Sequence, residues 1–263
     1  MIPSLPPLAT LPVTPGKLVV LALLAAFAVA NTRQGRAWYH LPPWEHAFGL
    51  IGLGLVLDGQ WMGLVDAPRE RMMGEVGRVL YVHVPAAWAT MVAFLFAFLF
   101  AFAFLMTGRR LLDHLVEATV EVGVVLNVLL LATGSIFARP TWGTWWTWDP
   151  RLTSSAVMLV AFVGVLLLRQ AVADPDRRAT WTSVATLLAA ASMAVTYFSV
   201  QLWRSIHQMQ SSPDTIDPAM VQILRLNAWA WLALTTWLVT RRYRLAVATA
   251  ALDEAPPLPE VPA

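Results

Sequence analysis

The chain has 263 residues, of which 58% are hydrophobic and only 13% charged, and its mean hydropathy is +0.61. Water-soluble domains usually carry about a quarter charged residues, so the composition excludes an ordinary soluble protein. The lack of cysteine excludes disulfide frameworks, thiolate metal sites, iron–sulfur clusters and cysteine nucleophiles. A net charge of +2 does not indicate nucleic-acid binding, because no basic face is clustered. The composition is typical of an all-α, polytopic membrane protein.

Apolar runs of sufficient length to cross a bilayer recur along the chain. A transmembrane helix needs about 20 apolar residues, because no water satisfies the backbone inside the hydrocarbon. Six runs predict such helices, at 44–64, 84–106, 115–137, 153–169, 184–203 and 219–240. A shorter apolar run, Leu18–Ala30, is interpreted as an extra or half-inserted N-terminal helix. These runs define an N-terminal extension (1–43), a transmembrane domain (44–244) and a Pro-rich cytoplasmic tail (245–263).

Arginines in the connections predict the orientation of the bundle, because cytoplasmic loops carry an excess of basic residues. One set of connections carries nine arginines, several of them paired at span ends, and the opposite set carries seven. The first set is therefore assigned to the cytoplasm, and the loops 65–83, 138–152 and 204–218 are expected to face outward. Glu117 and Glu121 lie four residues apart, hence on one helical face, and are expected at the cytoplasmic interface.

The outward connection before the fourth span is unusually rich in tryptophan. Four tryptophans fall within seven residues, at Trp142, Trp145, Trp146 and Trp148. One interpretation is an interfacial belt, since tryptophan favours the headgroup region. A belt needs only one or two tryptophans per helix end, however. The favoured interpretation is a flat aromatic shelf for a large planar ligand, with indole N–H groups free to donate.

Two of the five histidines lie in the expected outward regions. His83 precedes Pro85, which is expected to occupy the first turn of the second span, and His207 follows the fifth span. In a chain without cysteine, imidazole is the natural protein ligand for haem iron. The alternative is that each is a hydrogen-bonded surface histidine. The other three, His40, His46 and His114, fall on the cytoplasmic side, where snorkelling or capping is expected.

These segments resemble the CcmC family of cytochrome c maturation proteins, which handle haem through a tryptophan-rich WWD domain. The resemblance rests on His-Val-Pro-Ala-Ala-Trp at 83–88, the tryptophan-rich segment at 142–154, His-Gln at 207–208 and Asp-Pro-Ala-Met at 217–220. It covers 44–244 and leaves 1–43 outside. Pro150 departs from the pattern, because other members often carry a small residue there.

The resemblance implies a haem transporter rather than an enzyme, located in the bacterial inner membrane as a multi-pass protein. It implies that haem b is held at the periplasmic face by His83 and His207 as axial ligands. The loop 138–154 would bind the porphyrin through Trp142, Trp145, Trp146, Trp148 and Asp149. It also implies delivery to the periplasmic haem chaperone CcmE, with CcmD and the ABC-type pair CcmA and CcmB as further partners besides membrane lipid.

Charged residues near these motifs have expected roles of their own. Arg139, Arg151 and Arg204 flank the motifs, and a guanidinium binds a carboxylate bidentately, so each is a candidate partner for the haem propionates. Asp149 would repel a propionate and is expected to orient an indole, an arginine or a ligand histidine, or else to cap the fourth span. Two other classes remain open: a b-type electron-transfer cytochrome, and a non-haem permease or scaffold subunit.

Overall fold

The structure is a computed structural model that describes residues 43–207 and 217–253. The apolar run Leu18–Ala30, the tail after residue 253 and Gln208 lie outside the described residues. Within them, the chain forms six α-helices, joined in part by a π-helix (Met62–Asp66) and a 3-10 helix (Glu75–Val79). The α-helices are α2 (Pro43–Trp61), α3 (Leu80–Thr107), α4 (Arg110–Trp142), α5 (Pro150–Ala171), α6 (Pro175–Leu202) and α7 (Pro218–Asp253).

The prediction of a polytopic helical bundle is confirmed. In the part of the chain that is described, five helical segments are long and apolar enough to cross a membrane. They begin at Glu45, Glu75, Arg110, Pro150 and Pro175, and correspond to the first five predicted spans. The helix expected as the sixth span, α7, is longer than required but less apolar, because Arg225 and Asn227 interrupt its first half.

Three helices begin at an Asp–Pro pair. Asp149, Asp174 and Asp217 each precede a proline that is the first residue of α5, α6 or α7. In each case the aspartate Oδ1 accepts a hydrogen bond from a backbone N–H of the first turn, at 2.8–2.9 Å. Such a cap satisfies one of the open N–H groups of the helix, and the fixed φ of proline suits its first position. The sequence thus sets these three helix starts.

Helix α3 begins earlier than predicted. Leu80 is its first residue, so Pro85 lies inside the helix and not in its first turn. An internal proline leaves the carbonyl four residues before it without its helical donor. Here that carbonyl belongs to Tyr81, and the Gln60 amide Nε2 donates a hydrogen bond to it at 3.0 Å. A side chain from the end of α2 therefore allows α3 to start before the proline, and His83 falls in its first turn.

Other helix ends also differ from the predicted boundaries, and α4 and α6 begin five and nine residues earlier than predicted. Helix α4 includes Trp142 and ends at Gly143, whose φ of +77° is the left-handed conformation that glycine adopts readily. The tryptophan-rich connection is therefore only the short segment 143–149. Helix α7 continues to Asp253, so its last turns extend into the segment that the sequence assigned to the tail.

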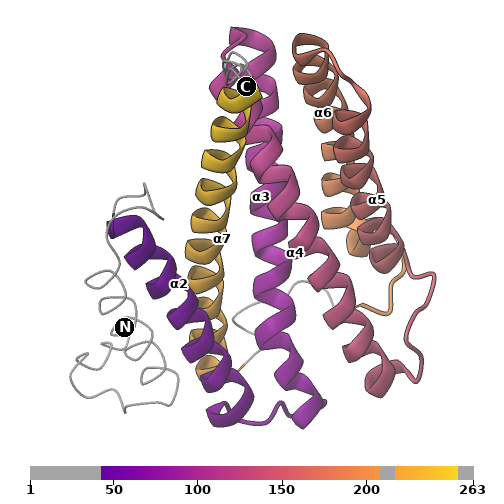
Figure 1. Cartoon of the computed structure of the whole chain (residues 1–263). Helices are drawn as coiled ribbons and strands as arrows, with labels where there is room; N and C mark the ends of the chain where they lie inside the picture. Colours follow the sequence, from indigo (N-terminus) through magenta and orange to yellow (C-terminus); the bar gives the residue numbers. More distant parts are fainter. Residues whose placement is uncertain (1–42, 208–216, 254–263) are drawn as a thin grey trace, which may run out of the picture.

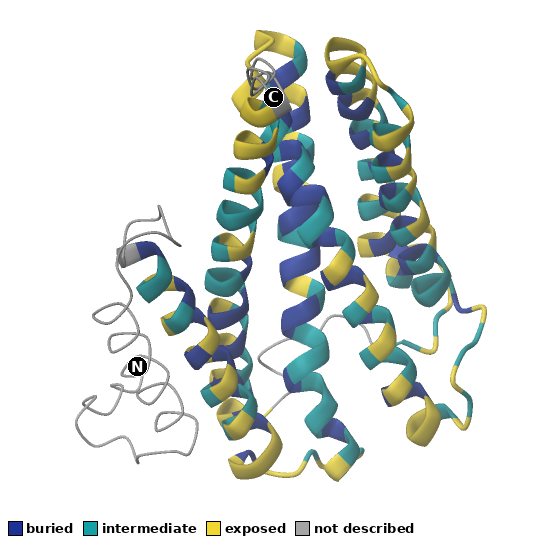
Figure 2. Cartoon of the chain, viewed as in Figure 1, coloured by how far each residue is buried: buried dark blue, intermediate teal, exposed yellow. Residues whose placement is uncertain are grey.

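The helices run roughly alongside one another, with α3 at the centre (Figure 1). Helix α3 packs against α4, α6 and α7, whereas α2 packs mainly on α7 and α5 mainly on α6. Buried residues are concentrated along α3 (Figure 2). We call the lower end of the bundle in Figure 1 the cavity end, because the first turn of α3 and the connection 143–149 meet there; the opposite end is the ion-pair end.

Candidate functional site

A cavity of about 830 Å³ lies at the cavity end, between the N-terminal parts of α3, α5 and α7 and the C-terminal parts of α4 and α6. Its lining is mostly apolar, from residues such as Leu130, Met158 and Leu224, with a few polar side chains among them. Its volume falls within the range of about 300–1,000 Å³ that is typical of sites for organic ligands. The cavity is therefore large enough for a ligand with several rings, and its apolar lining would shield such a ligand from water.

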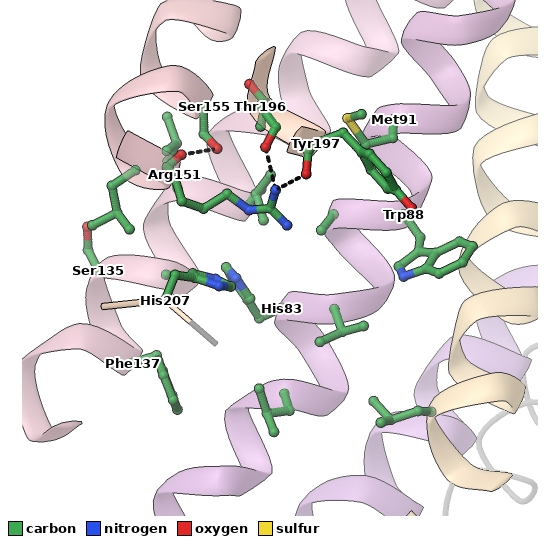
Figure 3. A pocket seen from close by; sticks show the side chains of 18 of the residues that line it. His83, Trp88, Met91, Ser135, Phe137, Arg151, Ser155, Thr196, Tyr197 and His207 are labelled. Atoms are coloured by element: carbon green, nitrogen blue, oxygen red, sulfur yellow. Dashed lines mark hydrogen bonds between the residues drawn. The ribbon is translucent and has the colours of Figure 1, made fainter. Parts of the chain in front are cut away.

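Both outward histidines line this cavity. Figure 3 shows the imidazoles of His83, from α3, and His207, from the segment after α6, pointing toward one another. The His83 ring lies against α4, where its Nδ1 is 3.1 Å from Thr133 Oγ1. A Cβ added to Gly134 would lie only 3.1 Å from His83 Cε1, so glycine at this position leaves room for the ring. The structure thus brings together two imidazoles that are far apart in the sequence.

Asp149 holds the segment that carries His207. Besides capping α5, its Oδ1 accepts a hydrogen bond from Ser205 Oγ at 2.9 Å and its Oδ2 one from the Ile206 N–H at 2.8 Å. The His207 N–H in turn donates to Ser205 Oγ at 3.0 Å. Asp149 is only 8% exposed, so these bonds are shielded from water. One carboxylate therefore ties the tryptophan-rich connection to the backbone beside His207.

The four tryptophans of the motif separate into two pairs. Trp142 and Trp146 line the cavity, and the Trp142 ring centroid is 6.5 Å from that of His207. Trp145 and Trp148 do not line it and are exposed, 59% and 83% respectively. Helix α4 carries Trp142 to the cavity wall, and Trp146 reaches the same wall from the connection that follows Gly143. Of the four tryptophans expected to form the shelf, these two line this cavity.

The three arginines expected near the ligand also differ in position. Arg151 lines the cavity, and its Nη1 donates to the backbone carbonyls of Thr196 and of Tyr197, the latter at 3.0 Å (Figure 3). Arg139 lies outside the cavity, because its guanidinium bonds to the Gly143 carbonyl at the end of its own helix. Arg204 is exposed and also lies outside the cavity lining.

Some lining residues were not among the expected site residues. Arg225, in the second turn of α7, faces the cavity, and among the described residues it forms no ion pair. An ionisable residue inside a predicted span is by default a functional candidate, so this rule would have identified it. Thr133 has no comparable sequence signal, because only the packing of α3 on α4 shows its contact with His83.

The donor set suits haem better than a bare metal ion. The described residues contain no group of three or more His, Asp or Glu side chains that could hold an ion alone. Two imidazoles are the axial pair of many haem sites, where the porphyrin supplies the other ligands. The apolar and aromatic lining suits a porphyrin, and two arginines suit carboxylates. The residues present therefore fit haem.

The fold and the site together define a class: a multi-pass membrane protein with a pair of imidazoles in an apolar cavity at one end of the bundle. The family model described as Heme exporter protein C matches residues 24–255. The chain is 33% identical over 208 residues to heme exporter protein C of Escherichia coli K12, covering 78% of this chain and 85% of that protein. It is 34% identical over 193 residues to heme exporter protein C of Bradyrhizobium diazoefficiens, covering 72% of each. The protein of the same name from Haemophilus influenzae is 30% identical over 201 residues, with 74% and 79% covered.

The chain belongs to the heme exporter protein C (CcmC) family, as the resemblance in its motifs indicated. It is a multi-pass protein of the bacterial inner membrane. The match of 24–255 is wider than the 44–244 over which the motifs carried the resemblance.

Proposed function

We propose that this chain is a haem transporter of cytochrome c biogenesis that holds haem at the cavity end and presents it to a periplasmic acceptor. The observation that carries the proposal is the pair His83 and His207, which approach one cavity from different segments of the chain. The names of its relatives, heme exporter protein C, support the same function.

The cavity supplies each contact that such a ligand requires. His83 and His207 would be the two axial ligands of the iron, and Trp142 and Trp146 would lie against the porphyrin. A site at the end of the bundle leaves one edge of a disc-shaped ligand accessible to another protein, which a carrier needs. A b-type cytochrome that keeps its haem instead usually buries both ligands between facing helices.

Arg151 and Arg225 are the proposed partners of the two haem propionates. Both line the cavity, whereas Arg139 and Arg204 do not. Arg151 uses Nη1 for backbone carbonyls, and no other hydrogen bond of its guanidinium is formed within the described residues. A guanidinium on the cavity wall can bind a carboxylate bidentately. Arg225→Met is expected to weaken haem retention, with Arg204→Met as the matched control outside the cavity.

The proposed ligand is haem b, and the proposed acceptor is the membrane-anchored chaperone CcmE, with CcmD and the CcmA–CcmB transporter as further partners. These follow from the family, and the geometry of an open cavity edge is compatible with transfer to a second protein. The face of the membrane on which the cavity end lies is proposed to be periplasmic, from the distribution of arginines.

The test is purification of the full chain in lipid nanodiscs, with bound haem measured by its absorption spectrum. His83→Ala and His207→Ala are each expected to lose most of the haem, whereas His114→Ala, at the other end of α4, should keep it. Co-expression with CcmE should give covalent haem on the chaperone with the wild type and little with His83→Ala. Haem that is retained with both histidines replaced would contradict the proposed ligation, and reversible electron exchange with a quinol would indicate a cytochrome.

A further inference from the structure

Thr133 makes the polar contact of the His83 ring with α4, and its geometry determines which ring nitrogen carries the proton. Thr133 Oγ1 lies 3.1 Å from His83 Nδ1. The same oxygen lies 2.9 Å from the Leu129 carbonyl and 3.1 Å from the Leu130 carbonyl, one turn back in α4. A threonine in a helix often donates its hydroxyl proton to such a carbonyl.

The protons in this group of atoms can be counted. A hydroxyl has one proton to donate and two lone pairs, and a carbonyl oxygen only accepts. If the Thr133 proton goes to a backbone carbonyl, the hydroxyl must accept from His83, so His83 Nδ1 carries a hydrogen. The Thr133 hydroxyl therefore favours a proton on His83 Nδ1.

The opposite arrangement gives up the bond from the Thr133 hydroxyl to the helix carbonyls. If Thr133 donated to Nδ1, the proton of neutral imidazole would lie on Nε2, on the cavity side of the ring. No hydrogen bond to His83 Nε2 is formed among the described residues. The Nδ1–H tautomer keeps both the bond from Thr133 to the helix carbonyls and the bond between Thr133 and His83, so it is the favoured one.

We propose that Thr133 is a positioning residue that holds His83 in the Nδ1–H tautomer, so that the Nε2 lone pair faces the cavity before any ligand arrives. The inference rests on the proposed function, since a lone pair on Nε2 is what an iron atom in the cavity would require. The hydrogen bond on the far nitrogen of a metal-binding histidine sets its tautomer and orientation. Thr133 would fill that role from a neighbouring helix.

The first measurement is the tautomer of His83 in the full chain without haem, in nanodiscs with ¹⁵N-labelled histidine. The nitrogen chemical shifts distinguish a protonated from an unprotonated ring nitrogen, and the His83→Ala spectrum identifies the signals. We expect the wild type and Thr133→Ser to show Nδ1–H, and Thr133→Val to lose this preference. Nε2–H in the wild type, or an unchanged Nδ1–H signal in Thr133→Val, would overturn the inference.

The second measurement is haem affinity. Replacing groups that orient a metal ligand typically weakens binding by about 10- to 100-fold, and we expect about tenfold for Thr133→Val and recovery with Thr133→Ser. Thr119→Val is the matched control, because Thr119 makes the same bond to a carbonyl of α4, Leu115 O, without a histidine contact. If Thr133→Val changes the tautomer but neither it nor His83→Ala affects haem, the proposed ligation fails while the tautomer assignment stands.

Discussion

Two sets of arginines near opposite ends of the bundle differ in their partners. At the ion-pair end, Arg169 binds Asp113 through two hydrogen bonds, at 2.7 and 3.1 Å, and Glu117 at 2.8 Å. Arg242 binds the same Glu117 at 2.8 Å and also Glu121 at 2.7 Å. Each carboxylate of this network has a cationic partner within the chain. At the cavity end, Arg151 and Arg225 line the cavity, and neither has a carboxylate partner among the described residues.

The difference separates charges that hold the bundle together from charges that are available to a ligand. The network joins α4 to α5 and α7, and the buried acids are neutralised by arginines from those helices. Arg151 is half-buried and Arg225 is exposed, and no carboxylate of the described residues pairs with either, so both guanidinium groups are open to an anionic ligand. Together with the two imidazoles, these arginines make the cavity end the candidate site.

The largest expected effect comes from breaking an ion pair at the ion-pair end. Arg169→Ala removes the partner of Asp113, whose side chain is only 4% exposed, and leaves a buried charge uncompensated. Loss of one partner of a buried pair typically costs about 3–5 kcal/mol of stability. The free energy of unfolding, measured by denaturant titration of the detergent-solubilised protein, should fall by about this amount. Arg110→Ala is the control, because its pair with Asp176 is exposed and worth about 1 kcal/mol or less.

The separation of roles between the two ends would be wrong if Arg169→Ala lost its bound haem while its free energy of unfolding stayed unchanged. We expect the reverse: less folded protein, with an unchanged amount of haem per folded molecule.

The next effect distinguishes two aspartates with the same capping role at opposite ends. Asp149→Ala and Asp174→Ala each remove a helix cap, which costs about 0.5–2 kcal/mol of stability. Only Asp149 also holds Ser205 and Ile206 beside His207. We expect Asp149→Ala to lower haem affinity by about tenfold or more, as for other groups that position a ligand. A haem titration of both variants checks this, and equal affinities would show that Asp149 is only a cap.

A smaller effect distinguishes the tryptophans. Trp146→Ala removes an indole from the cavity wall, and an aromatic contact is worth about 1 kcal/mol beyond the buried area, so haem affinity should fall about fivefold. Trp148→Ala should have a smaller effect, because that side chain is exposed and does not line the cavity, and its ring centroid lies 6.0 Å from that of Trp146. The absorption spectrum of the remaining haem should keep its bis-imidazole form in both variants.

The sequence predicts the fold well where local chemistry decides it, because apolar runs located the spans. The apolar runs placed the start of α6 at 184, nine residues late, since the polar first turns after Asp174 are helical but not apolar. The start of α3 was predicted late because it depends on Gln60, which compensates for Pro85 from another helix. A hydrogen bond between side chain and backbone of two different helices leaves no recognisable pattern in the sequence.

The site was predictable in its residue types and less so in its geometry. His83, His207 and the tryptophan-rich segment stand out because their composition is unusual and their order matches a known family. Which tryptophan faces the cavity depends on the helix end at Gly143, and which arginine faces it depends on how α5 and α7 pack. Thr133 contributes through such a tertiary contact and has no sequence signal, whereas Arg225 could have been found as an ionisable residue inside a predicted span.

The smallest expected effect tests how closely the His83 ring fits against α4. In Gly134→Ala the new Cβ would lie 3.1 Å from His83 Cε1, so the ring must move by a few tenths of an ångström toward the cavity. An overpacked core typically costs about 1–3 kcal/mol, but this ring borders a cavity and has room to move, so we expect about a threefold loss of haem affinity. Gly164→Ala is the control, because nothing lies within 4 Å of a Cβ added there. Equal haem affinity in the two variants would mean that the ring position is not restricted by α4, and the cavity end would then be less preorganised than its contacts indicate.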